Sequence, residues 1–308
     1  MSLDNRPASR RDAPMSTHAI PPRAIVMLGA LTILWGTNWT LFPYAVQEIS
    51  VWTFRSVVLG CAGLLLMVVA RLRGDSLAVP RKYWSAMAWA TGSFIVVWNV
   101  AGTYAALLIP SGQAAVLGFT MPLWSALIAW AVLGERPGQR LLLAIAVTGG
   151  GVLLLMLPGF SAYADAPLGF ALGLLAGLGW AVGTLVLQRG AVQLPVLVLT
   201  AWQLLLGVVP IGIAALVLGD HHWFMPSWQT IAVVSWITLV PMCIGNVCWF
   251  AIVGLLPANV AGLSSVLVPV VAMVSGAIVH AEPLGPLQLV SMALCVSGLV
   301  LALGQKKK

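Results

Sequence analysis

The sequence predicts an all-α integral membrane protein whose ten transmembrane helices form two inverted five-helix repeats around a central cavity. Three observations lead to this fold class. Hydrophobic residues make up 60% of the 308 residues and charged residues only 7%, a mixture with too little polar surface for a soluble protein. The apolar residues gather in runs of about twenty, the length that crosses a bilayer. The chain also repeats itself at a fixed offset.

Both ends of the chain are polar. Residues 1–23 hold several arginines among prolines and serines and lack the apolar core of a signal peptide, so we expect a disordered cytoplasmic tail. Residues 305–308 are expected to form a second, short cytoplasmic tail.

Ten apolar runs lie between these tails, separated by charged or turn-forming residues. The first five make up an expected first repeat, residues 24–157, and the last five an expected second repeat, residues 167–304. The ten predicted spans are 24–46, 51–70, 84–107, 112–133, 139–157, 167–187, 195–218, 229–253, 259–280 and 285–304.

The repeat is visible in residue types that are scarce in this chain. A shift of 147 positions superimposes five such residues on residues of the same type, and chance does not align rare residues so often at one offset. The matched pairs are Trp89 with Trp236, Asn99 with Asn246, Pro110 with Pro257, Pro122 with Pro269, and Glu135 with Glu282.

The lysines and arginines predict the orientation. All of them except Arg55 fall in the tails or in loops that alternate spans place on one side. Cytoplasmic loops hold such a positive excess, so we expect both termini in the cytoplasm and the chain in the cell inner membrane. The net charge of +7 then reflects topology, and no nucleic-acid partner is expected. Five spans per repeat place the second repeat upside down, a plan common in secondary transporters.

Several motifs make the chain resemble the EamA-type branch of the drug/metabolite transporter superfamily. They are Leu34–Asn38 (Leu-Trp-Gly-Thr-Asn), Thr53–Arg55, Gly134–Pro137 (Gly-Glu-Arg-Pro) and the repeated turns Pro110–Ala114 and Pro257–Ala261. Within that branch the sequence is similar to bacterial exporters of aromatic and other apolar amino acids. The resemblance implies a ten-helix fold and export of amino acids or related metabolites.

Polar residues within the spans are candidates for substrate binding, because polar groups are costly in hydrocarbon. Asn38, the repeat pair Asn99 and Asn246, and Tyr104 can donate or accept hydrogen bonds without carrying charge. For Asn99 and Asn246 the alternative is structural, since amides often tie transmembrane helices together.

Five tryptophans fall deep within predicted spans. They could line a cavity with broad apolar surfaces that suit varied apolar side chains. Packing or interfacial anchoring is the alternative for each one. The candidates are Trp39, Trp98, Trp124, Trp180 and Trp249.

Arg55 is the basic residue that breaks the topological pattern, about a turn inside the second span. It could bind a substrate carboxylate through two parallel hydrogen bonds. We favour a simpler interpretation, in which Arg55 extends to the outer surface or pairs with Glu48.

Missing groups narrow the function further. No predicted span contains Asp or Glu in its interior, which disfavours exchange of organic cations or a buried ion-coupling site. The chain has no phosphate-binding loop and no His or Cys pattern typical of a metal site, so no cofactor, metal or enzymatic activity is expected. We therefore expect a monomeric exporter of amino acids in the lipid bilayer. An exporter of another neutral metabolite or drug, or a nucleotide-sugar carrier of the same fold, remains the alternative.

Overall fold

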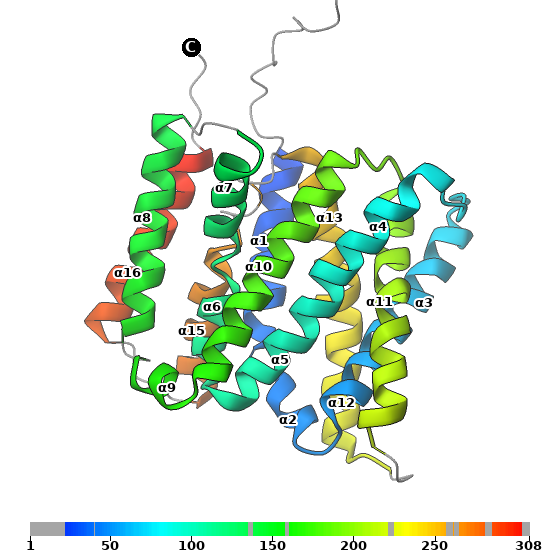
Figure 1. Ribbon diagram of the computed structural model, residues 1–308. Helices are drawn as coiled ribbons and strands as arrows, with labels where there is room; N and C mark the ends of the chain where they lie inside the picture. The colour runs from blue at the N-terminus through cyan, green and yellow to red at the C-terminus, as the bar shows by residue number, and fades with distance from the viewer. Residues whose placement is uncertain are drawn as a thin grey trace, which may run out of the picture.

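A computed structural model describes residues 22–39, 41–134, 138–157, 160–220, 225–256, 261, 265–280 and 285–303. These residues are almost entirely helical and contain no strand, which confirms the all-α class (Figure 1). The predicted tail at residues 305–308 and most of the predicted tail at residues 1–23 lie outside the described residues.

The first half of the chain contains helices up to residue 156. They are α1 (Pro22–Asn38), α2 (Phe42–Val46), α3 (Val51–Leu72), η1 (Arg81–Tyr83), α4 (Trp84–Ala90), η2 (Thr91–Val97), α5 (Trp98–Leu108), α6 (Ser111–Gly118), α7 (Met121–Ala131) and α8 (Gln139–Met156).

The second half begins with a short helix that precedes the long ones. Its elements are α9 (Phe160–Asp165), α10 (Pro167–Arg189), α11 (Val196–Leu218), α12 (Trp228–Ile237), η4 (Thr238–Gly245), α13 (Asn246–Leu255), α15 (Leu267–His280) and α16 (Pro286–Leu303).

Seven helices are long and apolar enough to cross a membrane. They include the continuous helices 81–108 and 228–255, each built from several of the elements above. Helices α1, α15 and α16 occupy the other three predicted spans and are not among those seven. Large apolar side chains such as Leu64, Leu153 and Ile213 are exposed on the outside of the bundle, where a soluble protein would be polar and a membrane protein meets lipid.

Two predicted spans contain a break in the regular α-helix, and both breaks have the same cause. The span expected at 24–46 divides into α1 and α2. The span expected at 112–133 contains a turn between α6 and α7, although residues 113–131 still form one helix long enough to cross a membrane. Pro43 and Pro122 lie in the first turns of α2 and α7. Proline lacks an N–H and clashes with the preceding turn, so it starts a new helix more readily than it continues one.

Two smaller boundary predictions were also wrong. The tail predicted to extend to residue 23 ends earlier, because Pro22 and Arg23 already belong to α1. The break predicted between residues 157 and 167 contains α9. These differences leave the order of the long helices unchanged.

The two longest helices each contain a π-helical segment. Element η2 covers Thr91–Val97 and η4 covers Thr238–Gly245, so both segments begin at positions 147 residues apart. Pro241 disturbs the hydrogen-bond ladder of η4, whereas η2 reaches the same winding without a proline. Such π segments within α-helices are rare and frequently lie at functional sites.

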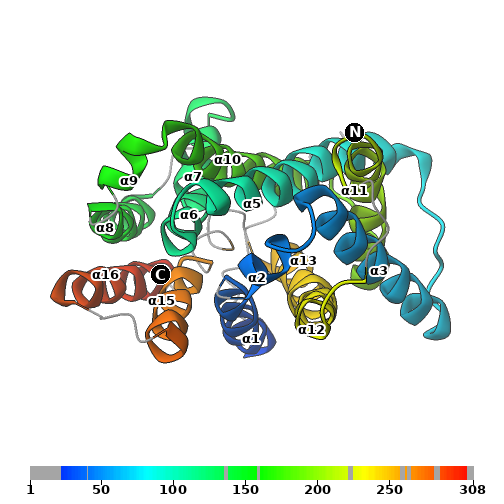
Figure 2. The same cartoon turned by 90° about the horizontal axis from the view of Figure 1, so that it is seen from below.

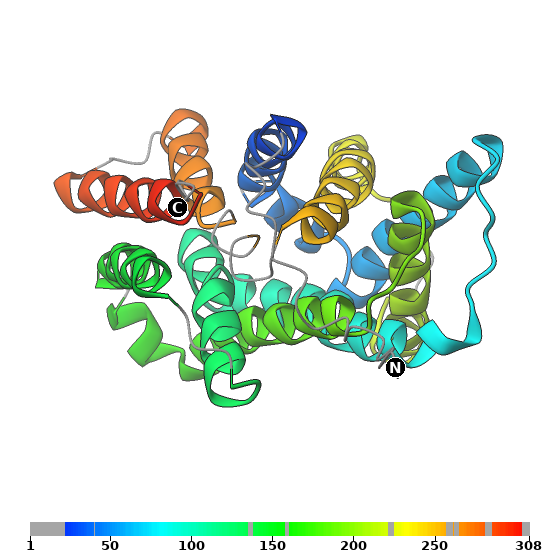
Figure 3. The ribbon, with the colours of Figure 1, turned by 90° about the horizontal axis from the view of Figure 1, so that it is seen from above.

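The helices pack in a pattern that relates the two halves. Helix α3 packs on α11 and α8 packs on α16, while α5 contacts α10 and α1 contacts α13. Viewed along the bundle, α3 with α11 and α8 with α16 occupy opposite edges (Figures 2 and 3). Between these edges lie α1, α5, α10 and α13, which surround the centre.

Corresponding helices of the two halves run in opposite directions (Figure 1). Helix α1 begins at the upper end and α10 at the lower end, whereas α3 begins at the lower end and α11 at the upper end. Helix α16 ends at the same upper end where α1 begins.

Candidate functional site

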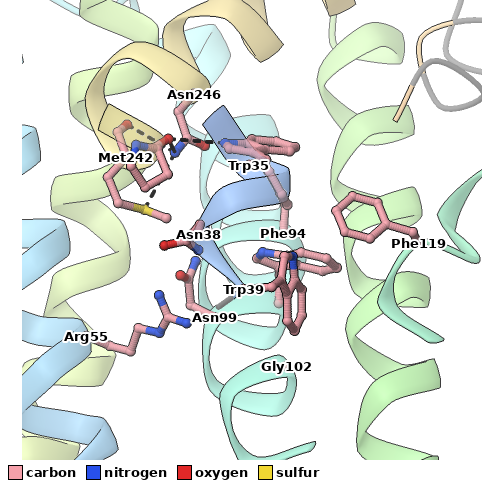
Figure 4. Close-up of a pocket in the computed structure, with 12 residues that line it drawn as sticks. Trp35, Asn38, Trp39, Arg55, Phe94, Asn99, Gly102, Phe119, Met242 and Asn246 are labelled. Atoms are coloured by element: carbon pink, nitrogen blue, oxygen red, sulfur yellow. Dashed lines mark hydrogen bonds between the residues drawn. The ribbon is translucent and has the colours of Figure 1, made fainter. Parts of the chain in front are cut away.

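A cavity of about 40 Å³ lies at the centre of the bundle (Figure 4). By the usual requirement for a buried water, this volume holds roughly three water molecules, far less than an amino acid needs. The cavity of this structure is therefore too small to hold an amino acid. The lining residues come from α1, α3, η2, α5, η4, α13 and the turns after α1 and α6: Trp35, Asn38, Trp39, Arg55, Phe94, Trp98, Asn99, Gly102, Phe119, Pro241, Met242 and Asn246.

Arg55 provides the charge in this lining. Its side chain is only 6% exposed, so the expectation that it extends to the outer surface was wrong. The Arg55 Nε donates a hydrogen bond to Thr103 Oγ1 at 2.8 Å, and the Thr103 hydroxyl donates in turn to the backbone oxygen of Asn99 at 2.5 Å. The guanidinium also lies 4.8 Å from the centre of the Phe54 ring. These contacts from α3 and α5 hold the guanidinium at the cavity wall.

Asn99 and Asn246 occupy equivalent places at the ends of the two π-helical segments. The Asn99 Nδ2 donates to the backbone oxygen of Ile95 at 2.8 Å, and the Asn246 Nδ2 donates to that of Met242 at 3.1 Å. Each of these bonds joins the amide to the carbonyl four residues earlier in the same continuous helix, and the Asn246 Nδ2 also donates to the Pro241 carbonyl at 3.3 Å. These amides therefore bond within their own helices, close to where the π-helical segment returns to α-helix. Both amides also line the cavity.

Two buried amide oxygens at the cavity accept no hydrogen bond from the residues that the structure describes. They are Asn38 Oδ1 and Asn99 Oδ1. Both amides lie on the same side of the cavity as the Arg55 guanidinium (Figure 4). A buried acceptor without a donor costs about 1–3 kcal/mol, so this part of the wall favours a ligand that donates hydrogen bonds.

Aromatic rings form the opposite part of the wall (Figure 4). Trp39 and Trp98 meet edge to face with ring centres 6.2 Å apart, and Trp98 lies 5.6 Å from Phe119. The Trp35 indole N–H donates to the backbone oxygen of Pro241 at 3.2 Å, which joins α1 to η4. The wall is broad and apolar, and ring geometry of this kind accepts varied apolar groups.

Trp180 and Trp249 form a second layer behind these rings. Both are fully buried, and their ring centres are 4.8 Å apart. Trp180 lies 4.7 Å from Trp98 and stacks on Phe94 at 5.6 Å. Neither tryptophan lines the cavity, so the pair supports the ring wall from behind.

The structure brings only part of the predicted site together. Asn38, Trp39, Trp98, Asn99 and Asn246 line the cavity, and Trp180 and Trp249 lie behind it. Tyr104 faces Trp52 instead, with ring centres 6.0 Å apart, and Trp124 is half-buried on α7 away from the lining.

Several lining residues were not considered as site residues: Trp35, Phe94, Gly102, Phe119, Pro241 and Met242. Arg55 was considered but was expected at the surface. Trp35 belongs to the Leu34–Asn38 motif and was within reach of the sequence argument. Phe94 and Pro241 lie 147 positions apart, within the two π-helical segments. Hydropathy does not reveal a π segment, so that signal was missed.

At the lower end of the bundle, two acids cap helices of the opposite half. The Glu48 carboxylate accepts hydrogen bonds from the backbone and hydroxyl of Ser227, the N-cap of α12. The Asp220 Oδ2 accepts from the backbone N–H of Ser50, the N-cap of α3, at 2.9 Å. We call these four residues the crossed caps.

The upper end of the bundle contains a more open pocket of about 380 Å³. It lies between the ends of α10 and α13 and the start of α11, and its lining includes Gln188, Leu199, Phe250 and Leu256. Phe250 meets Phe94, which lines the central cavity, at a ring distance of 5.9 Å. One ring from the pocket lining therefore contacts one ring from the cavity lining.

Known proteins resemble this chain over most of its length. It is 23% identical over 279 residues to the uncharacterized transporter YvbV of Bacillus subtilis, covering 91% of each chain. It is 27% identical over 277 residues to the uncharacterized inner membrane transporter YedA of Escherichia coli, covering 89% of this chain and 88% of that one. A probable amino-acid metabolite efflux pump of Escherichia coli is 27% identical over 199 residues, covering 62% of this chain and 67% of that one.

A solved crystal structure supports the fold. It matches with a TM-score of 0.73 at 18% sequence identity, covering 91% of this chain and 96% of that chain. The model of the EamA-like transporter family matches residues 22–157 and again residues 167–304. The chain therefore belongs to the EamA-like transporter family and is a multi-pass membrane transporter.

Proposed function

We propose that this protein is a secondary transporter that exports amino acids with aromatic or apolar side chains across the cell inner membrane. The observation that carries the proposal is the central cavity, where neutral amides and one guanidinium face a wall of aromatic rings. Such a lining suits a small solute with a polar head and an apolar body. The similarity to the probable amino-acid metabolite efflux pump of Escherichia coli supports the proposal.

The proposed mechanism is alternating access between two inverted repeats, residues 24–157 and 167–304. The family model matches the chain twice, and corresponding helices run in opposite directions. Inverted repeats place the substrate site at their interface near the middle of the membrane. The position of the cavity among α1, α3, α5 and α13 is consistent with that plan.

The upper end of the bundle is the proposed cytoplasmic side. The loop between α3 and α4 lies at that end (Figure 1) and carries Arg73, Arg81 and Lys82. Positive loops stay in the cytoplasm, and α1 begins and α16 ends at the same side. Both termini are accordingly proposed to be cytoplasmic. The crossed caps then close the outer side, while the pocket of about 380 Å³ opens toward the cytoplasm.

Transport by purified protein in liposomes tests the proposal. Labelled Phe, Met, Thr, paraquat and a nucleotide sugar are offered separately, with and without a pH gradient. We expect flux of Phe and Met, and little flux of paraquat or of the nucleotide sugar. Flux of paraquat or the nucleotide sugar without amino-acid flux would replace this proposal with the drug or nucleotide-sugar alternative.

A matched pair of glycine variants shows whether the central cavity carries the flux. Gly102 lines the cavity, and a Cβ there meets only Ala176, at 3.8 Å, so Gly102→Leu adds bulk beside the cavity. Gly92 is exposed on η2, and a Cβ there meets nothing within 4 Å. We expect Gly102→Leu to reduce Phe flux at least about tenfold, a loss of about 1.4 kcal/mol, and Gly92→Leu to leave it unchanged. Equal flux in the two variants would place the transport path elsewhere.

A further inference from the structure

We infer that Arg55, Asn38 and Asn99 form a binding site for the head group of an α-amino acid. Arg55 binds the carboxylate, and the two amide oxygens accept hydrogen bonds from the ammonium. The inference rests on the proposed function and adds to it the residues that recognise the substrate and the orientation in which it binds.

The position of Arg55 supports the carboxylate contact. The side chain is almost fully buried and lines the cavity. Its Nε bond to Thr103 fixes the plane of the guanidinium, and the terminal nitrogens face the amides of Asn38 and Asn99 (Figure 4). A guanidinium held in one plane presents a fork of N–H donors that matches the two oxygens of a carboxylate.

The two amide oxygens support the ammonium contact. Asn99 is 3% exposed, and its Nδ2 is bonded to the Ile95 carbonyl, which determines where its Oδ1 lies. Asn38 Oδ1 and Asn99 Oδ1 are both buried acceptors for which the described residues supply no donor. An ammonium group carries three donors and no acceptor. It can therefore satisfy both oxygens at once, and the carboxylate bound to Arg55 offsets the repulsion between the ammonium and the guanidinium.

The ring wall determines the orientation of the substrate. Arg55, Asn38 and Asn99 lie on one side of the cavity, and the rings of Trp39, Phe94 and Phe119 lie on the other (Figure 4). An amino acid bound through its head group to the first side directs its side chain toward the rings. This geometry favours aromatic and large apolar side chains over small polar ones.

The same geometry excludes close analogues that lack the carboxylate. An amine without a carboxylate places a second positive charge beside the Arg55 guanidinium, and like charges in a buried site repel strongly. An ester removes the anion that the guanidinium binds. A carboxylic acid without the amine keeps the contact to Arg55 and loses only the contacts to the amides. We therefore expect affinity to fall in the order phenylalanine, 3-phenylpropionate, phenylalanine methyl ester, phenethylamine.

Competition binding with the purified full-length protein in detergent tests this order without any mutation. Labelled phenylalanine is displaced by each analogue at one pH near neutrality. We expect the ester and phenethylamine to bind at least about 30-fold more weakly than phenylalanine, the loss typical when one partner of a buried charged contact is removed. Similar affinities for phenylalanine and its ester would overturn the inference.

Arg55 variants test which residue carries the discrimination. In Arg55→Gln we expect phenylalanine to lose affinity while the ester does not, so the ratio of their affinities falls toward one. Arg55→Lys keeps the charge without the planar fork and is expected to restore part of that ratio. Asn38→Ala should lower the affinity for phenylalanine and leave the affinity for 3-phenylpropionate nearly unchanged, because only phenylalanine carries the ammonium. If Arg55 had a purely structural role, its substitution would lower the affinity for all ligands together and leave the ratio of the affinities for phenylalanine and its ester unchanged.

The outcomes separate this inference from the proposed function. If wild-type protein neither binds nor transports phenylalanine, the proposed function fails. If it binds and transports phenylalanine but does not distinguish the ester or phenethylamine, the proposed function stands and the head-group site is wrong. If Arg55→Gln does not fold, the analogue series on the unmodified protein still decides the question.

Discussion

The two halves of the molecule share a backbone feature but use it differently. In each half a π-helical segment is followed by an asparagine whose Nδ2 bonds to the carbonyl four residues earlier. In the first half this asparagine, Asn99, leaves a buried Oδ1 facing the cavity near Arg55. In the second half the cavity receives Pro241, Met242 and Asn246 and no charged residue.

The comparison separates what the duplicated fold requires from what the site requires. The π-helical segment and the asparagine bond recur at equivalent positions of the two continuous helices 81–108 and 228–255. The polar groups that can bind a ligand gather in the first half, together with most of the ring wall. The site therefore lacks the symmetry of the scaffold, and its two walls need not contribute equally to binding.

The largest expected effect comes from removing the ring at the junction of the two halves. Trp180 on α10 is fully buried and lies 5.4 Å from Trp35 on α1, the first helix of the other half. Trp180→Ala leaves a cavity among several rings, and such changes cost about 3–5 kcal/mol. Reversible unfolding in a graded SDS mixture measures the loss. Trp130→Ala, at a site 58% exposed on the outside of the bundle, is the control, and an equal loss in both variants would contradict the prediction.

The two asparagines offer the sharpest test of the asymmetry. Asn99→Leu removes the bond to the Ile95 carbonyl, and Asn246→Leu removes the bonds to the carbonyls of Met242 and Pro241. A hydrogen bond contributes about 0.5–1.5 kcal/mol, so we expect Asn246→Leu to lose at least as much stability as Asn99→Leu. Only Asn99→Leu also removes an acceptor beside Arg55. Phenylalanine affinity should therefore fall about tenfold in Asn99→Leu, a change of about 1.4 kcal/mol, and much less in Asn246→Leu. Equal losses of affinity would mean that the halves contribute alike.

The crossed caps are expected to give the smallest effect, and it depends on pH. Hydrogen bonds from the side chain of Thr230 and then from Ser227 lower the pKa of Glu48 below its usual value of 4.5. For Asp220, burial alone would raise the pKa, but bonds from Ser50 and Thr53 outweigh it and lower the pKa below 3.8. A lowered folded-state pKa stabilises the protein above the usual pKa, and this contribution disappears as the pH falls through the folded-state value.

Melting temperatures of wild type and of the double variant Glu48→Gln/Asp220→Asn check this expectation. Near pH 7 the wild type should melt slightly higher, and the difference should shrink as the pH falls below about 4.5. Both carboxylates are largely exposed, so the difference at neutral pH is expected to be small. A difference that stays constant down to pH 3 would show that the charges of the crossed caps do not matter.

Fold class and most helix positions could be predicted from hydropathy, because a bilayer requires long apolar runs. The interruptions after Asn38 and Gly118 could not be predicted in this way. Pro43 and Pro122 lie in runs that remain apolar across the break, so the average hydropathy does not change there. The π-helical segments were missed for the same reason, and with them the lining residues Phe94 and Met242.

The site was predicted best where polarity alone is informative. Asn38, Asn99 and Asn246 stand out in apolar spans, and all three line the cavity. The tryptophans were chosen by depth, which does not determine the direction a ring faces, so Trp124, Trp180 and Trp249 are not part of the lining. Arg55 was assigned to the surface because arginines near span ends usually extend outward. The hydroxyl of Thr103, on another helix, holds it inside instead, and no local pattern in the sequence indicates that partner.

In the crossed caps, an acid from each half of the chain caps a helix of the other half, and this affects any movement at the lower end. Glu48 precedes α3 yet bonds to the N-cap residue of α12, and Asp220 follows α11 yet bonds to the N-cap residue of α3. Moving the two loops apart would break both sets of hydrogen bonds and uncap α3 and α12 together. We therefore expect both caps to be lost in one step when the lower end opens.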